Sequence, residues 1–280
     1  MRVAATQLPL PTASPPRRRR RAQHMPTAAA PRPPPRALAA ILRSRVIACL
    51  RAEDPLWSGD REGSWLAVTS DPLRGSLPLQ WRDGVAGGAC GRARRRHSGE
   101  LLDAVCRLEV VMSTPGVLEV IEDLCRSYPS LTFGVGTVLN AADARKAIGA
   151  GAQFLMSPGT VMEVLHDLEE SKVLYIPGVL TPTEVLSACS AGAKVVKVYP
   201  VSVMGGEVYM SALKKPFPLV PMVASQGIQI GSIKGYVEAG ASAVVLSDAI
   251  FDKELMRKGK FSEISELASQ ATFEALQSTK

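Results

Sequence analysis

Histidine is scarce in this 280-residue sequence, which contains His24, His97 and His166 and no two histidines close together. Histidine-based metal sites and Ser-His-Asp triads need histidine in defined arrangements, so this scarcity argues against both classes. The five cysteines are odd in number and form no C-x-x-C pair, which indicates free thiols in a reducing compartment. The longest apolar runs are too short to span a membrane, so we expect no transmembrane helix and no membrane partner.

Acidic residues are missing from the first 50 positions, which contain ten arginines and no lysine. That stretch carries a formal charge of +10, and because the whole chain carries +7, the remainder carries −3. The basic character therefore belongs to one end of the chain and not to the part that folds. A basic end is a weak reason to expect nucleic-acid binding, and we predict no nucleic-acid partner.

Residues 1–36 read "MRVAATQLPLPTASPPRRRRRAQHMPTAAAPRPPPR", a composition that cannot build a hydrophobic core. An acid-poor, arginine-rich start is typical of an organelle transit peptide. We therefore expect the protein in a plastid or another organelle if this leader is a transit peptide, and in the cytoplasm otherwise. The alternatives are a disordered leader, a true start at Met25, or a nucleic-acid-binding arm at residues 17–21.

From residue 108 the chain alternates short β-branched runs with amphipathic stretches. The runs are "LEVVM" at 108, "LTFGVGTV" at 131, "FLMSPG" at 154, "VLYIPGV" at 173, "VVKVYP" at 195, "LVPMVASQ" at 219 and "AVVLSD" at 243. The last six begin 19 to 24 residues apart, which is the length of a strand followed by a helix. Buried strands that alternate with helices predict a parallel sheet.

Capping signals mark the helices between these runs. "NAAD" at Asn140 and "TPTE" at Thr181 predict helix starts, and the glycines of "GAGA" at 149, "AGA" at 191 and "AGA" at 239 predict helix ends. An earlier run, "RVIACL" at 45, follows a helical "ALAAILRS" and brings the number of runs to eight. The sequence thus predicts an α/β fold, a closed (β/α)8 TIM barrel over residues 37–280. An open doubly wound sheet is the alternative.

Residues 52–107 interrupt this pattern. All three tryptophans fall in this stretch, and no sustained period of 3.6 or 2 is present. Structureless segments of this length are uncommon inside compact domains. The stretch is either a genuine insertion or a gene-model error such as translated intron sequence, and we favour the second. In both cases the first βα unit is disrupted.

Polar residues occur in or just after the apolar runs, where the chemistry of a barrel is found. They are Arg51, Glu109, Thr137, Ser157, Lys197, Ser225 and Asp248. A lysine inside an apolar barrel has a lowered pKa, and its neutral amine can form a Schiff base with a ketone. Glu109 could then move protons, and Arg51 could bind a substrate carboxylate. On spacing alone a strand lysine such as Lys197 is usually a solvated edge residue. We interpret Lys194, on the opposite face, as structural.

Several segments match one family in order and spacing. They are "VIACLRAED", "LEVVMSTPG", "GVGTVLN", "AGAQFLMSPG", "IPGVLTPTE", "VKVYP" and "KPFPLVPMVASQGI". By these segments, over about residues 37–51 and 108–277, the chain resembles the class I aldolases that cleave 2-keto-3-deoxy-6-phosphogluconate (KDPG) and 4-hydroxy-2-oxoglutarate (KHG). The resemblance implies a TIM barrel that assembles as a homotrimer, with no metal and no organic cofactor.

The resemblance also implies roles for individual residues. Lys197 corresponds to the Schiff-base lysine and Glu109 to the catalytic acid and base. Arg51 and Thr137 correspond to ligands of the pyruvyl carboxylate, and Pro158 lies in the loop that lines its pocket.

The sequence departs from the family at the distal end of the substrate. The family commonly binds phosphate with "TGG" after strand seven and "GGS" after strand eight, through backbone N–H groups. Here "SQG" (Ser225, Gln226 and Gly227) and "LSD" (ending at Asp248) occupy those places. Asp248 would set a carboxylate beside a phosphate dianion, a repulsive contact, unless its side chain instead points away and caps the N–H groups of the following segment. We keep Ser225, Gly227 and Asp248 as expected substrate-binding residues and expect a non-phosphorylated or carboxylate-bearing substrate to be favoured.

The predicted function is a class I aldolase, an aldehyde-lyase that converts a 2-keto-4-hydroxy acid to pyruvate and an aldehyde, with a small keto acid as its partner. One alternative is a non-catalytic barrel that binds a small keto acid or only self-associates. Another is a barrel isomerase or decarboxylase that works without a Schiff base.

Overall fold

The computed structural model describes residues 35–51, 107–168, 171–258 and 260–278. These residues belong to one compact unit, Pro34–Lys280. The predicted leader and the atypical segment lie almost wholly outside the described residues, so their interpretation stays a prediction. Two boundary residues differ from the predicted limits, because Arg36 already begins a helix and Arg107 already begins a strand.

Nine parallel strands form a single sheet in the described part of the chain. They are β1 (Val46–Leu50), β2 (Arg107–Val111), β3 (Thr132–Gly136), β4 (Phe154–Met156), β5 (Leu174–Ile176), β6 (Gly178–Val179), β7 (Val196–Val198), β8 (Met222–Ser225) and β9 (Ala243–Leu246). Their order in the sheet is β5-β4-β3-β2-β1-β9-β8-β7-β6. Each predicted run therefore contains a strand.

The sheet is a nearly closed barrel because its two edge strands are halves of one run. β5 pairs with β4 and β6 pairs with β7, yet only Pro177 separates β5 from β6 along the chain. Proline has no N–H to donate, which interrupts the ladder at this residue, while its carbonyl accepts the Lys197 N–H at 2.8 Å. The predicted (β/α)8 barrel is confirmed, with its fifth strand split in two, and the open doubly wound alternative is not adopted.

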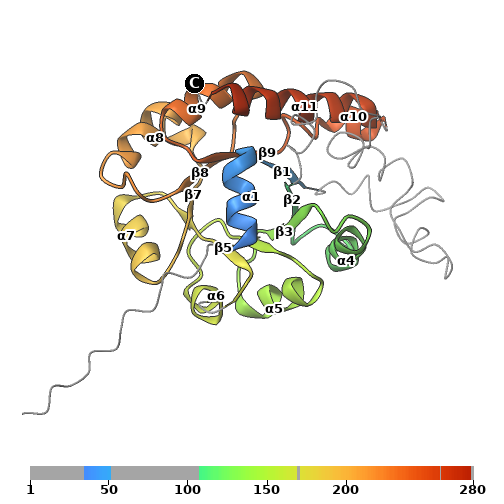
Figure 1. The fold of residues 1–280 in the computed structure, drawn as a ribbon, viewed down its shortest axis with the longest axis horizontal. Helices are drawn as coiled ribbons and strands as arrows, with labels where there is room; N and C mark the ends of the chain where they lie inside the picture. Colours follow the sequence, from blue (N-terminus) through green and yellow to red (C-terminus); the bar gives the residue numbers. More distant parts are fainter. Residues whose placement is uncertain (1–34, 52–106, 169–170, 259, 279–280) are drawn as a thin grey trace, which may run out of the picture. The chain divides into compact units, whose positions relative to one another are not determined.

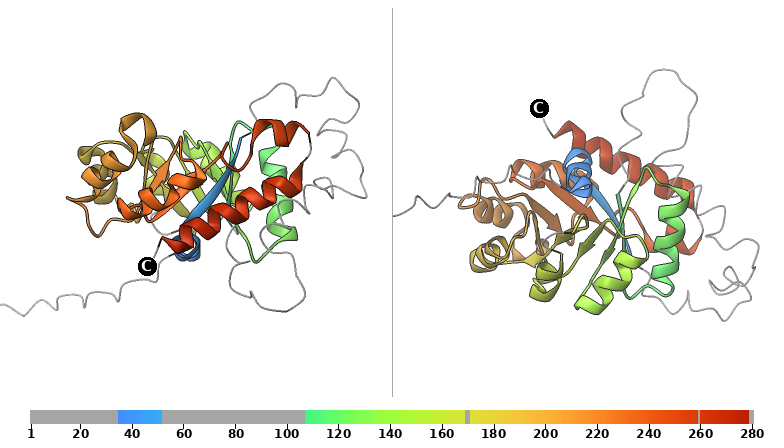
Figure 2. Two further views of the ribbon diagram at one scale, coloured as in Figure 1. Left: turned by 90° about the horizontal axis from the view of Figure 1, so that it is seen from above. Right: turned by 60° about the horizontal axis from the view of Figure 1, so that its bottom comes forward.

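Helices cover the outside of this ring of strands, and one further helix lies in its middle (Figure 1). They are α1 (Arg36–Ser44), α4 (Val117–Ser127), α5 (Ala141–Gly149), α6 (Met162–Asp167), α7 (Pro182–Ser190), α8 (Gly206–Lys214), α9 (Ile233–Glu238), α10 (Lys253–Arg257) and α11 (Phe261–Gln277), with 3-10 turns η2 (Ser202–Met204) and η3 (Ile230–Ser232). α11 packs against α9 and β1 (Figure 2). None of the helices in these residues is long and apolar enough to cross a membrane.

The predicted capping signals are confirmed. The Asn140 side chain accepts the Asp143 N–H at 2.8 Å at the start of α5. Thr181 and Glu184 form a reciprocal capping box at the start of α7. The predicted helix ends at 149, 191 and 239 are each followed by a glycine with positive φ. Local sequence therefore determines where these helices begin and end.

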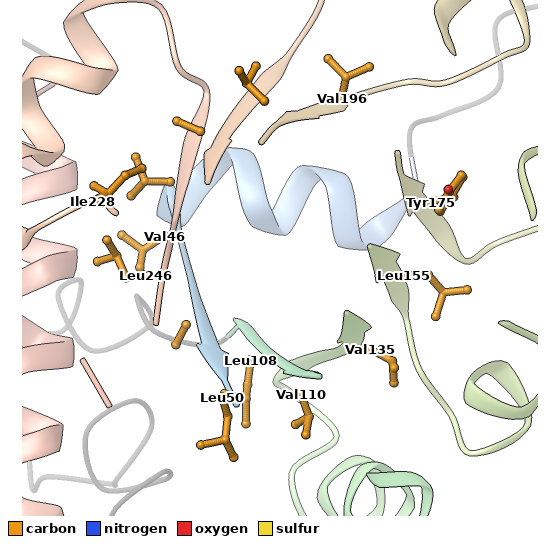
Figure 3. Close-up of a cluster of buried hydrophobic side chains, with 14 of the residues drawn as sticks. Val46, Leu50, Leu108, Val110, Val135, Leu155, Tyr175, Val196, Ile228 and Leu246 are labelled. Atoms are coloured by element: carbon orange, nitrogen blue, oxygen red, sulfur yellow. The ribbon is translucent and has the colours of Figure 1, made fainter. Parts of the chain in front are cut away.

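Side chains alternate between two hydrophobic layers along each strand. Leu108 and Val110 on β2 and Val196 on β7 face outward into the layer between sheet and helices, as Figure 3 shows. The residues that alternate with these along each strand point into the barrel. Glu109 and Lys197 therefore share the inner face.

The helix α1 closes the amino-terminal end of the barrel. It lies in the middle of the ring of strands (Figure 1), and its Ala37, Leu38 and Ile41 belong to the inner hydrophobic cluster. Lys194, expected on the same strand as Lys197, instead lies two residues before β7 and is exposed. The amino-terminal end of the barrel is therefore closed by apolar side chains of α1, and Lys194 is exposed to solvent before β7.

Candidate active site

Lys197 is a buried amine at the centre of β7. Its exposed fraction is 5 %, and its neighbours Val196 and Val198 are fully buried. Burial lowers the pKa of Lys197, and the positive charge of Arg51 lowers it further, while the negative charge of Glu109 acts in the opposite direction. The aromatic ring of Tyr199 lies with its centroid 5.0 Å from Nζ. An amine in this environment loses its proton more readily than an exposed lysine.

Glu109 is a buried carboxylate on the same inner face. Its exposed fraction is 3 %, and it pairs in register with Cys49 on β1 and Gly134 on β3. Its charge acts on Lys197, so the two groups that the sequence singled out lie in one electrostatic environment. A carboxylate and an amine that share a desolvated cavity can exchange protons with a bound substrate.

Gly136 makes room for the Glu109 carboxylate. A Cβ atom at Gly136 would lie 1.6 Å from Glu109 Oε1. Sequence reasoning missed this residue, although a glycine inside a strand, here in "GVG", often marks the close approach of another group. The side chain of Glu109 therefore lies directly over β3.

Cys49 is a further residue that sequence reasoning did not place in the site. It is 6 % exposed and faces the barrel interior beside Glu109. Burial raises the pKa of its thiol well above the usual range, and the charge of Glu109 and a hydrogen bond to it raise the pKa further. The thiol therefore stays protonated and donates to the carboxylate. The sequence indicated that the cysteines are free thiols, but it did not indicate that Cys49 lies beside Glu109.

A Gly136→Ala substitution tests the placement of Glu109. The added methyl group must displace the carboxylate, so we expect catalysis that uses Glu109 to fall by about 10²-fold, as for a 1 Å misplacement of a reacting group. Overpacking should also destabilise the fold by about 1–3 kcal/mol. Cleavage rate and denaturant midpoint are the measurements. Gly149→Ala is the matched control, since nothing lies within 4 Å of its added Cβ. Full activity in Gly136→Ala would contradict this placement.

Thr137 follows β3 in a strained conformation. Its φ of +56° lies in the left-handed region, which a β-branched residue rarely adopts. The next residue holds the turn, since the Val138 N–H donates to the Met156 carbonyl at 3.0 Å. Such strain costs about 1–3 kcal/mol and clusters at functional sites. The structure thus adds backbone strain as a third indication at a residue that its position after an apolar run and the family resemblance had already singled out.

The other predicted site residues lie at the carboxyl-terminal end of the barrel, which we call its mouth, and they differ in solvent exposure. Arg51 is exposed at the end of β1, and its charge acts on both Lys197 and Cys49. Pro158 is half-buried in the loop after β4. Ser225, at the end of β8, is 6 % exposed.

Ser157 is a polar strand-end residue that the structure places away from the interior. It is fully buried and shares a hydrogen bond with the hydroxyl of Tyr175, which belongs to the outer hydrophobic layer. The Tyr175 hydroxyl in turn accepts the Val161 N–H at 3.0 Å. Ser157 therefore supports the loop after β4 and does not face the amine.

The ends of β8 and β9 form the rim of the site. Gln226 and Gly227 are exposed and both have positive φ, +88° and +71°. Asp248 is exposed, and the Ser247 hydroxyl contacts its Oδ1 at 3.4 Å. The buried pair lies deeper in the barrel, and the predicted distal residues lie at its edge.

The parallel barrel thus brings a buried amine, which can act as a nucleophile, and a buried carboxylate to one inner face. Residues 99–267 match the family described as "Aldolase: KDPG and KHG aldolase", and the chain belongs to this family. It is 31% identical over 163 residues to the 2-dehydro-3-deoxy-phosphogluconate aldolase of Treponema pallidum, covering 58% of this chain and 78% of that protein.

Two further relatives agree with this assignment. The KHG/KDPG aldolase of Escherichia coli strain K12 is 27% identical over 164 residues, covering 59% of this chain and 77% of that protein. The solved 4-hydroxy-2-oxoglutarate aldolase/2-deydro-3-deoxyphosphogluconate aldolase from TTHB1 is 26% identical, with a TM-score of 0.63, covering 85% of this chain and 98% of that chain. These homologues are named as aldolases, which are lyases.

Proposed function

We propose that this protein is a class I aldolase that cleaves a 2-keto-4-hydroxy acid to pyruvate and an aldehyde through a Schiff base on Lys197. The observation that carries the proposal is the buried amine of Lys197, whose pKa burial lowers, on the same inner face as the Glu109 carboxylate. Membership of the KDPG and KHG aldolase family supports the same reaction class. We further propose that the protein assembles as a homotrimer.

The reaction begins with attack of the neutral Lys197 amine on the substrate ketone, which forms a carbinolamine and then an iminium with loss of water. Glu109 removes the proton of the C4 hydroxyl, the C3–C4 bond breaks, and its electron pair enters the enamine as the aldehyde leaves. Protonated Glu109 returns that proton to C3, and water hydrolyses the pyruvyl iminium. No net water is consumed, because the water released when the iminium forms is taken up again when the pyruvyl iminium is hydrolysed.

Three residues are proposed to hold the pyruvyl part during these steps. The planar Arg51 guanidinium would bind the substrate carboxylate in a two-point contact. Thr137 would add a hydrogen bond from the strained turn after β3, and Pro158 would line the pocket. Their positions at the carboxyl ends of β1, β3 and β4 support this arrangement.

Borohydride trapping of pyruvate, followed over pH, tests the proposal. An amine is nucleophilic only when neutral, and the neutral form predominates above its pKa. Because burial lowers the pKa of Lys197 from the usual 10.5, the trapping rate should rise with pH and level off below pH 10.5. Lactate, which has no ketone, is the control ligand. Binding of pyruvate without any adduct would instead favour the non-catalytic barrel.

A further inference from the structure

The loops after β7 and β8 are joined at the mouth of the barrel. The Ser202 hydroxyl, in η2, donates to Gln226 Oε1 at 2.6 Å. The neighbouring Val201 N–H donates to the Ser225 carbonyl at 3.0 Å. We name the Ser202–Gln226 pair the clasp. It links residues 24 positions apart in the loops that follow the adjacent strands β7 and β8, and it holds the loop after the lysine strand in place.

The clasp includes a strained backbone at Gln226, and its Ser202 side chain fills the space beside Gly227. Gln226 has a φ of +88°, a region that favours glycine. Beside it, a Cβ atom at Gly227 would lie 2.2 Å from the Ser202 hydroxyl oxygen. The hydroxyl therefore occupies the volume next to the Gly227 backbone. A strained residue that persists at the edge of a reaction site points to a function there.

The clasp lies where the distal part of a substrate would be bound. Lys197 pairs in register with Val223 on β8, and Ser225, two residues further, is the last residue of that strand. A ketone attached to Lys197 extends toward the carboxyl ends of the neighbouring strands, where barrels of this type often bind phosphate. Gln226, immediately after β8, is therefore placed to contact the end of the substrate that leaves as the aldehyde.

The charge of this rim disfavours a dianion. Residues 199–206, 225–233 and 247–251, which follow β7, β8 and β9, include no lysine, arginine or histidine and one acidic residue, Asp248. Asp248 is exposed. A phosphate here would gain no cationic side chain from these loops and would lie near a carboxylate, which offers only acceptors.

The orientation of Gln226 favours a different group. Its side-chain oxygen already accepts from Ser202, so its amide N–H groups remain to donate. We propose that the clasp, together with Asp248, makes the site select non-phosphorylated 2-keto-4-hydroxy acids, whose distal end is a hydroxyl or a carboxylate. This inference rests on the proposed aldolase function and names its substrate class.

The test compares two substrates that differ only in the phosphate, 2-keto-3-deoxygluconate and its 6-phosphate, by the ratio of their kcat/KM values. KHG is the carboxylate-ended third substrate. In the wild type we expect the unphosphorylated compound and KHG each to be cleaved at least as well as the phosphorylated one. A preference of the wild type for the phosphorylated compound overturns the proposal.

Two variants test the residues themselves. Gln226→Gly with Asp248→Ser should raise the phosphate preference by about tenfold or more, because the repulsion is removed and backbone N–H groups become accessible. Ser202→Ala, which frees Gln226 without changing charge, should move the ratio in the same direction by a smaller factor. A ratio unchanged in both variants also overturns the proposal.

Controls separate this inference from the proposed function. Glu238→Ser removes one negative charge at the last residue of α9, the helix that leads the chain from the loop after β8 back to the start of β9, and should leave the ratio unchanged. Pyruvate trapping is measured in every preparation, together with thermal unfolding. Missing adduct in folded wild type would contradict the aldolase itself, whereas normal trapping with strong phosphate preference would contradict only the clasp.

Discussion

A Lys197→Ala variant should lose both aldol cleavage and the borohydride-trapped pyruvyl adduct. The reason is that Lys197 is the amine buried on the inner face of the barrel, and without it the ketone has no nucleophile to form the iminium. Lys197→Arg should behave in the same way, because a guanidinium stays protonated. Cleavage assays and mass spectrometry of the reduced protein are the measurements.

The loss should not come from unfolding. Lys197→Met keeps the length of the side chain but leaves the buried Glu109 carboxylate without its cationic neighbour, which costs stability. We therefore expect Lys197→Met to unfold at a lower temperature than the wild type, yet to be folded and inactive at the assay temperature. Lys194→Ala is the matched control, since Lys194 is exposed and lies just before the same strand. An adduct formed at the wild-type rate in Lys197→Ala would refute the assignment.

The second large effect concerns Glu109. In Glu109→Gln the amide keeps the shape of the side chain but cannot carry the proton, so proton transfer should slow by about 10²–10⁴-fold. Imine formation should survive in part because Lys197 is intact. The variant should thus trap pyruvate with borohydride yet hardly exchange the methyl protons of pyruvate with deuterium, as followed by NMR.

A surface substitution of the same type controls for the loss of a carboxylate. Glu122 is 61% exposed and pairs with Arg126 on α4, an interaction of little energetic weight. Glu122→Gln should exchange the methyl protons as the wild type does. Normal exchange in Glu109→Gln would show that the proton moves through another group.

The sequence predicted the barrel and its buried pair because both depend on local patterns. Short β-branched runs at regular spacing predict parallel strands, and a charged residue between two valines on such a run stands out, as Lys197 does. The sequence analysis grouped Ser157 with the polar residues at the chemically active end of the barrel, and the alternation of side chains along the strand argues against this grouping. Counting alternate residues from Phe154, which faces inward, places Ser157 on the outer side.

Other features depend on contacts between distant residues and could not be read from one sequence. Gly136 matters because Glu109, on the neighbouring strand, lies over it. The hydrogen bond between Ser202 and Gln226 joins two loops, and no local motif predicts it. The positive φ of Thr137 is likewise imposed by its surroundings, since a threonine has no intrinsic preference for that conformation.

The apolar plug formed by α1 also limits how molecules can enter and leave the barrel. Ala37, Leu38 and Ile41 pack into its amino-terminal end, so a ligand of Lys197 must enter from the carboxyl-terminal end. In the proposed reaction the ketone, the departing aldehyde and the water that hydrolyses the iminium would therefore share one entrance.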